Sequence, residues 1–347
     1  MASLLQYLAE MTAHRDHTLL DVSVVSALHQ LTHSRDVRLL EIFQFRDALY
    51  LRPKVWTRAG KVWSAEEAGD SEQPKEPLAN YPLLMDCIEQ RQQGVENRRA
   101  DGSVVFWFPI WLSEKAISCL ELHAPLPLTG EARNIAEGIL QVYRNYQSLL
   151  DYSERDSLTG LLNRKTFDEK FSKIAFSMQP GEECVVSQDA NERRGCMEST
   201  EQWLAVIDID HFKKVNDEYG HLYGDEVLIL VANILKSSFR TQDRIFRFGG
   251  EEFVVLLRSV TLTNARKIFD RFRRKVEAYH FPQVERVTVS VGFVGISSNM
   301  PVVILGHADQ ALYHAKTHGR NRVCFYDDLV SQGLLHSETS NSSVEFF

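Results

Sequence analysis

The chain has 347 residues and a formal net charge of −8, with 44% hydrophobic and 25% charged residues. This composition is that of a globular protein of about two domains, and the acidity argues against a protein that coats nucleic acid. We find neither a signal peptide nor an apolar run long enough to span a membrane. The five cysteines are scattered, so no disulfide framework or structural zinc site is expected, and the cytoplasm is the expected compartment.

Residues 1–127 are predicted to form a small α+β domain with an antiparallel sheet. Residues 22–31 (VSVVSALHQL) have a helical pattern. Strand patterns occupy residues 37–45, 48–52, 104–112 and 116–124, with turns expected at residues 46–47 and 113–115. The polar residues 64–77 are expected to form an exposed loop.

Residues 128–155 are predicted to form a connector helix. Its apolar side chains follow the a and d spacing of a heptad, at Ile135, Ile139, Val142, Tyr146 and Leu149. About two heptads are too few to establish a coiled coil, so the helix either packs on its own domain or pairs with a second copy of the chain. Its place between two domains favours the pairing, which makes it a candidate dimerisation element.

The second domain is predicted to span residues 156–328, followed by a mobile tail over residues 329–347. Residues 179–202 are polar and rich in turn formers, which indicates a long surface loop. Residues 203–209 (WLAVIDI) then read as a strand buried on both faces, and the alternation of strand side chains puts Asp208 and Asp210 on one face. A carboxylate at the end of a buried strand needs a helix to cap, a lysine to pair with or a metal ion to bind.

The segment RIFRFGGEEFVVLL (residues 244–257) has the pattern of a β-hairpin. Gly249 and Gly250 are expected to supply the positive φ angles of its tight turn, and Glu251 and Glu252 are expected on opposite faces of the ribbon. If the hairpin pairs beside the strand that carries Asp208, carboxylates meet where Mg²⁺ prefers oxygen ligands. The alternative is an exposed acidic tip.

Two further segments carry polar side chains suited to a nucleotide. Asn216, and Asp225 near the start of a helix, have the hydrogen-bonding groups to read a purine edge, although Asp225 is equally suited to cap that helix. Lys316 in the last turn of a helix, and Arg320 just beyond Gly319, suit phosphate, although a helix C-terminus favours basic residues in any protein. Gly319 is predicted to be the C-cap.

Six segments in order, DSLTGLLNR, DIDHFKKVND, GHLYGDEVL, RFGGEEF, SVGF and AKTHGRNRV, resemble the GGDEF-domain diguanylate cyclases over residues 155–326. The resemblance implies a ferredoxin-like palm domain that makes cyclic di-GMP from two GTP molecules as a homodimer, with Mg²⁺ or Mn²⁺ as cofactor. The first domain resembles a GAF-like sensor in outline, and its ligand or partner is unknown. The alternative function is a catalytically idle domain that binds GTP or cyclic di-GMP.

The resemblance also implies roles for individual residues. Metal ligands are implied at Asp208, at the carbonyl of Ile209, and at Glu251 and Glu252. Catalytic roles are implied for Glu251, Glu252 and Lys213. Substrate contacts are implied for Phe212, Lys213, Asn216, His221, Asp225, Gly249, Gly250, Lys316 and Arg320.

An inhibitory product site is implied by RTQD, in which Arg240 and Asp243 have the RxxD spacing and precede the glycine pair at the family's offset. Arg271, on the next basic helix, is a candidate for a further arginine contact. By spacing alone, Arg240 and Asp243 would form an ordinary surface ion pair.

Overall fold

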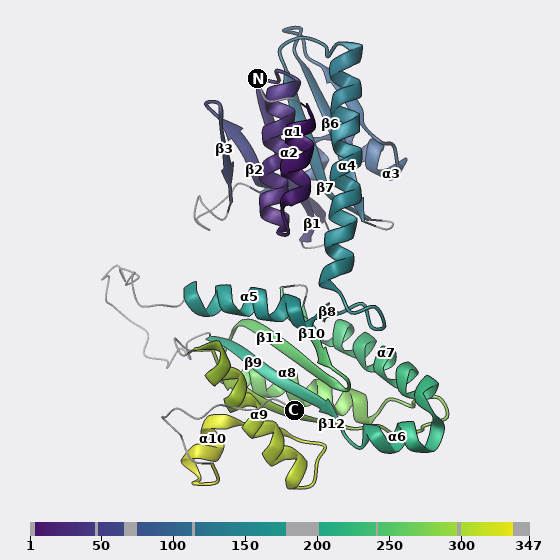
Figure 1. The fold of residues 1–347 in the computed structure, drawn as a ribbon, viewed down its shortest axis with the longest axis vertical. Coiled ribbons are helices and arrows are strands. Elements are labelled where there is room, and N and C mark those ends of the chain that lie inside the picture. The colour runs from purple at the N-terminus through teal and green to yellow at the C-terminus, as the bar shows by residue number, and fades with distance from the viewer. Residues whose placement is uncertain are drawn as a thin grey trace, which may run out of the picture. The chain divides into compact units, whose positions relative to one another are not determined.

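The computed structural model describes residues 4–45, 48–65, 75–112, 115–177, 201–240, 242–296 and 300–335 (Figure 1). It consists of two compact units, Met1–Ser153 and Glu154–Phe347. The turn expected at residues 46–47, most of the turn at 113–115, most of the loop at 179–202 and the tail beyond residue 335 lie outside the described residues. Among the helices described, none combines the length and hydropathy that a membrane span requires.

The first unit is built on one antiparallel sheet, as its strand patterns predicted. The strand order is β3-β2-β1-β7-β6-β5, and the short β4 pairs with β2. The strands are β1 (Asp36–Phe45), β2 (Ala48–Arg58), β3 (Lys61–Ser64), β4 (Glu76–Pro77), β5 (Val95–Arg98), β6 (Val104–Leu112) and β7 (Lys115–Ala124). An antiparallel sheet with helices is therefore confirmed, while the GAF-like assignment stays a prediction.

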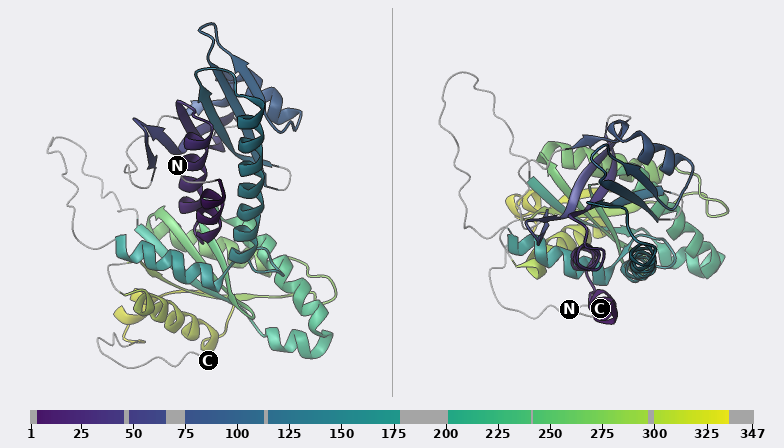
Figure 2. Two further views of the ribbon diagram at one scale, coloured as in Figure 1. Left: turned by 45° about the horizontal axis from the view of Figure 1, so that its top comes forward. Right: turned by 90° about the horizontal axis from the view of Figure 1, so that it is seen from above.

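Helices cover this sheet because its strands are apolar on both faces. The helices are α1 (Leu4–Ala13), α2 (His17–Leu31), α3 (Pro82–Glu89) and α4 (Gly130–Glu154), and a 3₁₀ turn lies at Leu78–Asn80. α1, α2 and α4 share one core with the sheet face that carries Phe106 and Phe108 (Figures 1 and 2). The opposite face, which carries Val105 and Trp107, packs against residues of α3.

Helix α4 belongs to the first unit rather than forming a separate connector. Its buried stripe includes Ala136, Leu140 and Tyr143, which pack on its own sheet. Of the predicted heptad positions, Ile139 is fully buried within this unit, whereas the Leu149 side chain is 61% exposed. Ile135 and Tyr146 also pack against this core, so packing on its own domain, the alternative to pairing, accounts for much of the helix.

The second unit contains a six-stranded sheet in the order β13-β12-β9-β11-β10-β8. The strands are β8 (Leu162–Asn163), β9 (Glu201–Ile209), β10 (Arg244–Gly249), β11 (Glu252–Val260), β12 (Val289–Gly295) and β13 (Val323–Phe325). The helices are α5 (Arg164–Ser177), α6 (Phe212–Tyr219), α7 (His221–Ser238), α8 (Leu262–Glu277), α9 (Pro301–Thr317) and α10 (Tyr326–Ser331). The predicted buried strand and β-hairpin are confirmed as β9 and as β10 with β11.

Alternate residues of β9 enter two different cores. Ala205 and Ile207 pack on the side of α7 and α8, and Leu204 and Val206 pack on the side of α9. Asp208 therefore follows Val206 onto the α9 side of the sheet. This double burial explains why residues 203–207 of the strand are all apolar.

Close packing of α9 against β12 depends on a glycine. A Cβ atom at Gly292 would lie 2.1 Å from the backbone nitrogen of Leu312 and 2.2 Å from the carbonyl oxygen of Ala308. The glycine thus allows the backbone of α9 to rest on β12. That contact sets how closely the end of α9 approaches the end of β9.

The tail predicted at residues 329–347 begins too early. Leu329 lies within α10 and is buried, and Leu335 packs against the same core. These two apolar side chains extend the folded unit beyond residue 328, because burying them is worth more than leaving them in water.

Candidate active site

The candidate site lies where β9 ends, between the hairpin and the last turn of α9. Asp208 pairs in register with Glu252 of β11 on one side and with Ser290 of β12 on the other. Its carboxylate is almost fully buried, and Lys316 of α9 places Nζ 2.7 Å from Asp208 Oδ2. Two residues far apart in sequence are therefore brought into direct contact, and the lysine partner that the sequence left open for Asp208 is present.

The carboxylates of this site are electrostatically crowded. Burial raises the pKa of Asp208, and the charge of Asp210 raises it further, against the opposing effect of Lys316. Burial and then the charge of Asp208 raise the pKa values of both Glu251 and Glu252. Lys316 acts on all three carboxyl groups, so one ammonium group faces a surplus of negative charge that an added cation would relieve.

The oxygen donors of this site are of the kind that Mg²⁺ takes. Within the described ranges, no three His, Cys, Asp or Glu side chains are grouped closely enough to form a metal site. Mg²⁺ is usually bound by one or two carboxylates and completed by water and substrate phosphates. Asp208 and Glu251, with the carbonyl of Ile209 next in the chain, offer oxygen donors of that kind.

The hairpin turn is formed by Gly250 and Glu251, between the paired residues Gly249 and Glu252. Gly250 has a φ of +45°, whereas Gly249 lies outside the positive-φ region. The prediction of two positive φ angles is therefore wrong for Gly249, which ends β10 in the ladder. A Cβ atom at either glycine would meet nothing within 4 Å, so the backbone here is open to a ligand.

Arg247 anchors this turn, a role that the sequence reading missed. Its Nε and Nη2 lie 3.1 and 2.9 Å from the carbonyl oxygen of Gly250. Its Nη1 also donates to both carboxylate oxygens of Asp156, at 3.0 and 3.1 Å. Arg247 lies in the motif RFGGEEF and Asp156 in DSLTGLLNR, so the family resemblance contained a signal for both residues. Asp156 thus ties the first segment of the unit to the glycine turn.

Both glutamates are close enough to Asp208 to be affected by its charge. Glu251 lies in the turn, and its backbone carbonyl accepts a hydrogen bond from the Ile209 N–H at 3.4 Å. Glu252 starts β11. The two glutamates were expected on opposite faces of the hairpin, but the charge of Asp208 therefore affects both.

The predicted purine-reading residues lie at the junction of α6 and α7. Gly220, with a φ of +87°, separates the two helices, and α7 begins at His221. Asp225 therefore lies inside α7 and does not cap it, which removes the alternative reading of this residue. Gly224 contacts Asn216 so closely that a Cβ atom there would lie 1.9 Å from Asn216 Oδ1, so the glycine makes room for this amide.

Phe212, at the start of α6, can offer a ligand its backbone N–H but not its side chain. The Phe212 side chain is buried in the core that includes α7 and α8, and His211, with a φ of +60°, precedes the helix. Lys213 is exposed in the first turn, and His221 is exposed at the start of α7. The unpaired N–H groups of a helical first turn suit a phosphate, so Phe212 is available through its main chain alone.

The loop after α9 holds Arg320 in a constrained conformation. The C-cap of α9 is His318, so Gly319, predicted to be the C-cap, is the residue after it and has a φ of +109°. Arg320 and Asn321 also have positive φ values of 58° and 48°. The Asn321 N–H donates to Asp210 Oδ2 at 3.0 Å. Asp210 accepts further hydrogen bonds from the hydroxyls of Thr288 and Ser290, both at 2.7 Å. Asp210 thus fixes the loop that presents Arg320.

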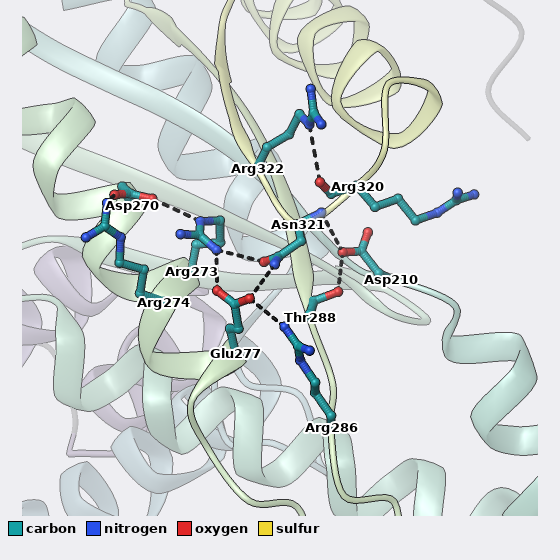
Figure 3. A network of polar contacts seen from close by, with 10 residues as sticks. All are labelled: Asp210, Asp270, Arg273, Arg274, Glu277, Arg286, Thr288, Arg320, Asn321 and Arg322. Carbon is teal, nitrogen blue, oxygen red and sulfur yellow. Dashed lines mark hydrogen bonds and ion pairs between the residues drawn. The ribbon is translucent and has the colours of Figure 1, made fainter.

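A polar network extends from this loop to α8 (Figure 3). Arg273 donates to Asn321 Oδ1 at 2.9 Å, and the Asn321 side-chain amide donates to Glu277 at 2.8 Å. Arg273 also donates to Glu277, at 2.7 Å, and Arg286 completes the group with a 2.6 Å hydrogen bond to the same carboxylate. Sequence reasoning missed these residues, because no local pattern links α8 to the loop.

The RxxD residues form a closed turn rather than a surface ion pair. The Arg240 N–H donates to Asp243 Oδ2 at 2.9 Å, and the Asp243 N–H donates to the Arg240 carbonyl at 3.0 Å. Among the described residues no ion pair joins the two side chains, and that alternative is wrong. The Arg240 side chain is exposed. Arg271 donates to the Ser238 carbonyl at 2.9 Å, which brings it close to this turn.

Residues 187–322 match the family model described as "Diguanylate cyclase, GGDEF domain". The chain is 38% identical over 227 residues to the probable diguanylate cyclase DgcT of Escherichia coli, a match that covers 63% of this chain and 46% of that protein. It is 41% identical over 231 residues to diguanylate cyclase A of Treponema denticola, covering 63% of this chain and 58% of that one. The chain thus spans less than two thirds of the length of either relative.

Among solved structures, the active GGEEF domain of a diguanylate cyclase from Vibrio cholerae is 30% identical, with 48% of this chain and 97% of that chain covered and a TM-score of 0.39. The coiled coil and GGDEF domain of DgcB from Caulobacter crescentus, in complex with c-di-GMP, is 26% identical. That match covers 57% of this chain and 100% of the other, with a TM-score of 0.47.

Proposed function

The chain belongs to the GGDEF family through residues 187–322, and we propose that it is a diguanylate cyclase that condenses two GTP molecules into cyclic di-GMP. The observation that carries this proposal is the buried Asp208 beside Glu251, Glu252 and Lys316, next to a glycine turn that is open to a ligand. A surplus of carboxylate charge beside an accessible backbone suits a triphosphate that arrives with a divalent cation.

Asp208, Glu251 and the Ile209 carbonyl would hold Mg²⁺ or Mn²⁺, with Glu252 next to the metal region. When bound, the ion neutralises phosphate oxygens and the charge that develops on the leaving pyrophosphate. Lys316 and Arg320 act on the same triphosphate from the end of α9, and the N–H groups at the start of α6, with Lys213 beside them, approach it from β9. The residues of this chain thus position the phosphates and balance their charge.

Glu251 is the proposed general base. Glu251 lies in the turn beside the open glycine backbone, and a positioned carboxylate can take a proton from a reacting hydroxyl. A carboxylate oxygen of Glu251 would accept the proton of the attacking 3′-hydroxyl. Asn216 and Asp225 would select guanine, with Asp225 exposed and free of any capping role.

The reaction requires two copies of the domain, so we propose a homodimer. Each 3′-oxygen attacks the α-phosphorus of the other GTP, which forms two phosphodiester bonds and breaks two α–β anhydride bonds. Two pyrophosphates leave. The exposed Leu149 and Tyr152 at the end of α4 support a contact between copies there, through which the first unit would control the geometry of the pair.

Product inhibition at Arg240 and Asp243 is a second part of the proposal. The exposed Arg240 side chain and the nearby Arg271 are suited to guanine edges and phosphates. Arg240→Ala is expected to raise the concentration of cyclic di-GMP that halves the rate, while the initial rate without product is unchanged. Lys267→Ala, on α8, serves as a matched loss of one positive charge.

The main proposal is tested by incubating the purified full chain with GTP and Mg²⁺ and measuring cyclic di-GMP and pyrophosphate by chromatography. The two products are expected in a 1:2 ratio, because two pyrophosphates leave for each cyclic di-GMP formed. Asp208→Asn and Glu251→Gln should abolish both products, and chelation of the metal should do the same. A chain that binds GTP or cyclic di-GMP in calorimetry but forms no product at any protein concentration would be the idle binding module instead.

A further inference from the structure

A cavity of about 880 Å³ lies in the first unit, between α4 and the sheet edge formed by β5 and β6. It is far in sequence from the GGDEF residues and plays no part in the chemistry proposed for them. Its volume is within the range of small-molecule binding sites. Its lining combines two phenylalanines with three arginines and two glutamates, which makes its chemistry specific enough to interpret.

The floor of the cavity is apolar. The rings of Phe106 and Phe108 stack with 6.3 Å between centroids and 13° between planes, and both side chains are buried. Gly94, which precedes β5, makes this floor possible, because a Cβ atom there would lie 2.8 Å from the Phe108 ring. The two residues are only 4% and 8% exposed, so a ligand in the cavity meets a small apolar part of their rings.

The arginines of the lining are not equally engaged. Arg98 and Arg133 both donate to the carboxylate of Glu96, and Arg133 also lies over the Phe106 ring. Arg144 differs: among the described residues its side chain makes no hydrogen bond or ion pair, and Glu137 acts on it only through its charge. A guanidinium that lines a cavity without a protein hydrogen bond can donate to an anion that enters the cavity.

The charge balance of the lining indicates what kind of anion fits. Arg98, Arg133 and Arg144 carry three positive charges and Glu96 and Glu137 carry two negative charges, which leaves one net positive charge. A monoanion neutralises this surplus, whereas a phosphate ester near neutral pH would exceed it. The planar guanidinium of Arg144 also matches a carboxylate in a paired, two-bond geometry.

We propose that this cavity binds a small organic monocarboxylate, with the carboxylate paired to Arg144 and the apolar part on Phe106 and Phe108. Arg133, Glu137, Gln141 and Arg144 lie on α4, whereas the phenylalanines lie on β6 (Figure 1). The ligand therefore joins α4 to the sheet. Since α4 continues to Glu154, where the second unit begins, occupancy bears on the helix through which the first unit would act. Only this regulatory consequence rests on the proposed cyclase function.

The experiment measures binding to the purified full chain by calorimetry and by ligand-detected NMR. The probes are benzoate, 3-phenylpropanoate and hexanoate, each compared with its uncharged alcohol, and phenyl phosphate. We expect saturable binding of at least one carboxylate and at least tenfold weaker binding of its alcohol, because a charged hydrogen bond contributes about 1.5–3 kcal/mol. Tighter binding of phenyl phosphate than of every carboxylate would overturn the monocarboxylate assignment.

Two variants test the location. Arg144→Gln should weaken carboxylate binding roughly 10- to 150-fold, the fold-change that corresponds to the loss of one charged hydrogen bond. Gln141→Trp, at an exposed position of α4, should block the cavity while leaving Arg144 in place, and this keeps the test valid if Arg144→Gln impairs folding. Arg58→Gln, an exposed arginine outside the cavity, is the control and should bind as the unchanged chain does.

Failure of all three carboxylates to bind, or binding that neither Arg144→Gln nor Gln141→Trp weakens, would refute the proposal. Because the readout is binding to the first unit, it does not depend on cyclic di-GMP synthesis. A chain with no cyclase activity still tests the cavity, and an empty cavity leaves the cyclase proposal unaffected.

Discussion

Replacing Lys316 by methionine would remove a positive charge from the most crowded carboxylate group of the second unit while keeping the length of the side chain. Lys316 Nζ lies 2.7 Å from Asp208 Oδ2, and the two side chains are 32% and 4% exposed. Without the ammonium group, Asp208 remains buried next to the charges of Asp210, Glu251 and Glu252. We therefore expect Lys316→Met to destabilise the metal-free protein as well as to impair catalysis.

The size of the effect follows from the burial of the two partners. Removing one partner of a fully buried ion pair costs about 3–5 kcal/mol, because an uncompensated charge stays in the interior. Since about a third of the Lys316 side chain is exposed, water screens part of the interaction, and we expect about 2–3 kcal/mol. This loss corresponds to a roughly 30- to 150-fold increase in the population of the opened state.

Hydrogen exchange measured by mass spectrometry suits a chain of two units, because peptides from β9 and β12 report on the second unit alone. In the presence of a chelator, the slowest amides of these strands should exchange roughly 30- to 150-fold faster in Lys316→Met. Added Mg²⁺ should restore more protection to the variant than to the unchanged chain, because the cation replaces the lost positive charge.

Lys165→Met is the matched control. Lys165 forms an i,i+4 ion pair with Glu169 at 3.9 Å on α5, and both side chains are more than half exposed, so its removal should cost only about 0.3–0.5 kcal/mol. If Lys316→Met exchanges no faster than Lys165→Met, then Lys316 does not compensate a buried carboxylate and the electrostatic account of the site is wrong.

Three further predictions concern other positions. Gly292→Ala should destabilise the second unit by about 3 kcal/mol or more, because the added Cβ meets the backbone of α9. The control is Gly306→Ala in α9, where a Cβ atom meets nothing within 4 Å, and it should be neutral or stabilising. Equal hydrogen-exchange rates in β12 of the two variants would contradict this packing. Gly224→Ala should raise the KM for GTP about 5- to 30-fold with little change in kcat. The reason is that the added Cβ forces the Asn216 amide to turn away, so that its proposed hydrogen bond to guanine, of about 1–2 kcal/mol, is lost. An unchanged KM would show that Asn216 does not recognise guanine. Burial raises the pKa of Glu121, but hydrogen bonds from His123 and Arg38 outweigh burial and lower it from 4.5 to about 2. The ionised Glu121 therefore stabilises the folded protein fully above pH 4.5, and this stabilisation is lost as the pH falls toward 2. Glu121→Gln should flatten this part of the acid unfolding curve, followed by tryptophan fluorescence, and an unaltered curve would show that the buried carboxylate does not govern it.

The sequence of the second unit determined its local elements well. The apolar run that became β9, the glycine-containing hairpin and the positive φ of Gly319 all follow from short-range rules, namely side-chain alternation and turn chemistry. The candidate residues were also identified from the order and spacing of their motifs. The local rules went too far at Gly249, which stays in the ladder, and at Asp225, which lies inside α7.

Long-range contacts were beyond the reach of such rules. Lys316 contacts Asp208 because Gly292 lets α9 rest on β12. The loop that presents Arg320 is held because its neighbour Asn321 is hydrogen-bonded to Asp210 and Arg273, which belong to other parts of the fold. The partners in each case are separated by long stretches of chain, and neither periodicity nor local propensity contains information about which helix end will approach which strand end.

The same division holds in the first unit. The sequence by itself determined an antiparallel sheet and a long helix with apolar side chains at heptad spacing. Only the tertiary structure decided that Leu140 and Tyr143 join the heptad position Ile139 in the core while Leu149 stays exposed. It also decided that Arg144 lines a cavity over Phe106 and Phe108. The physical reason is that an amphipathic pattern specifies which residues prefer burial, whereas the face that is buried, and the space left beside it, depend on how the other elements pack against it.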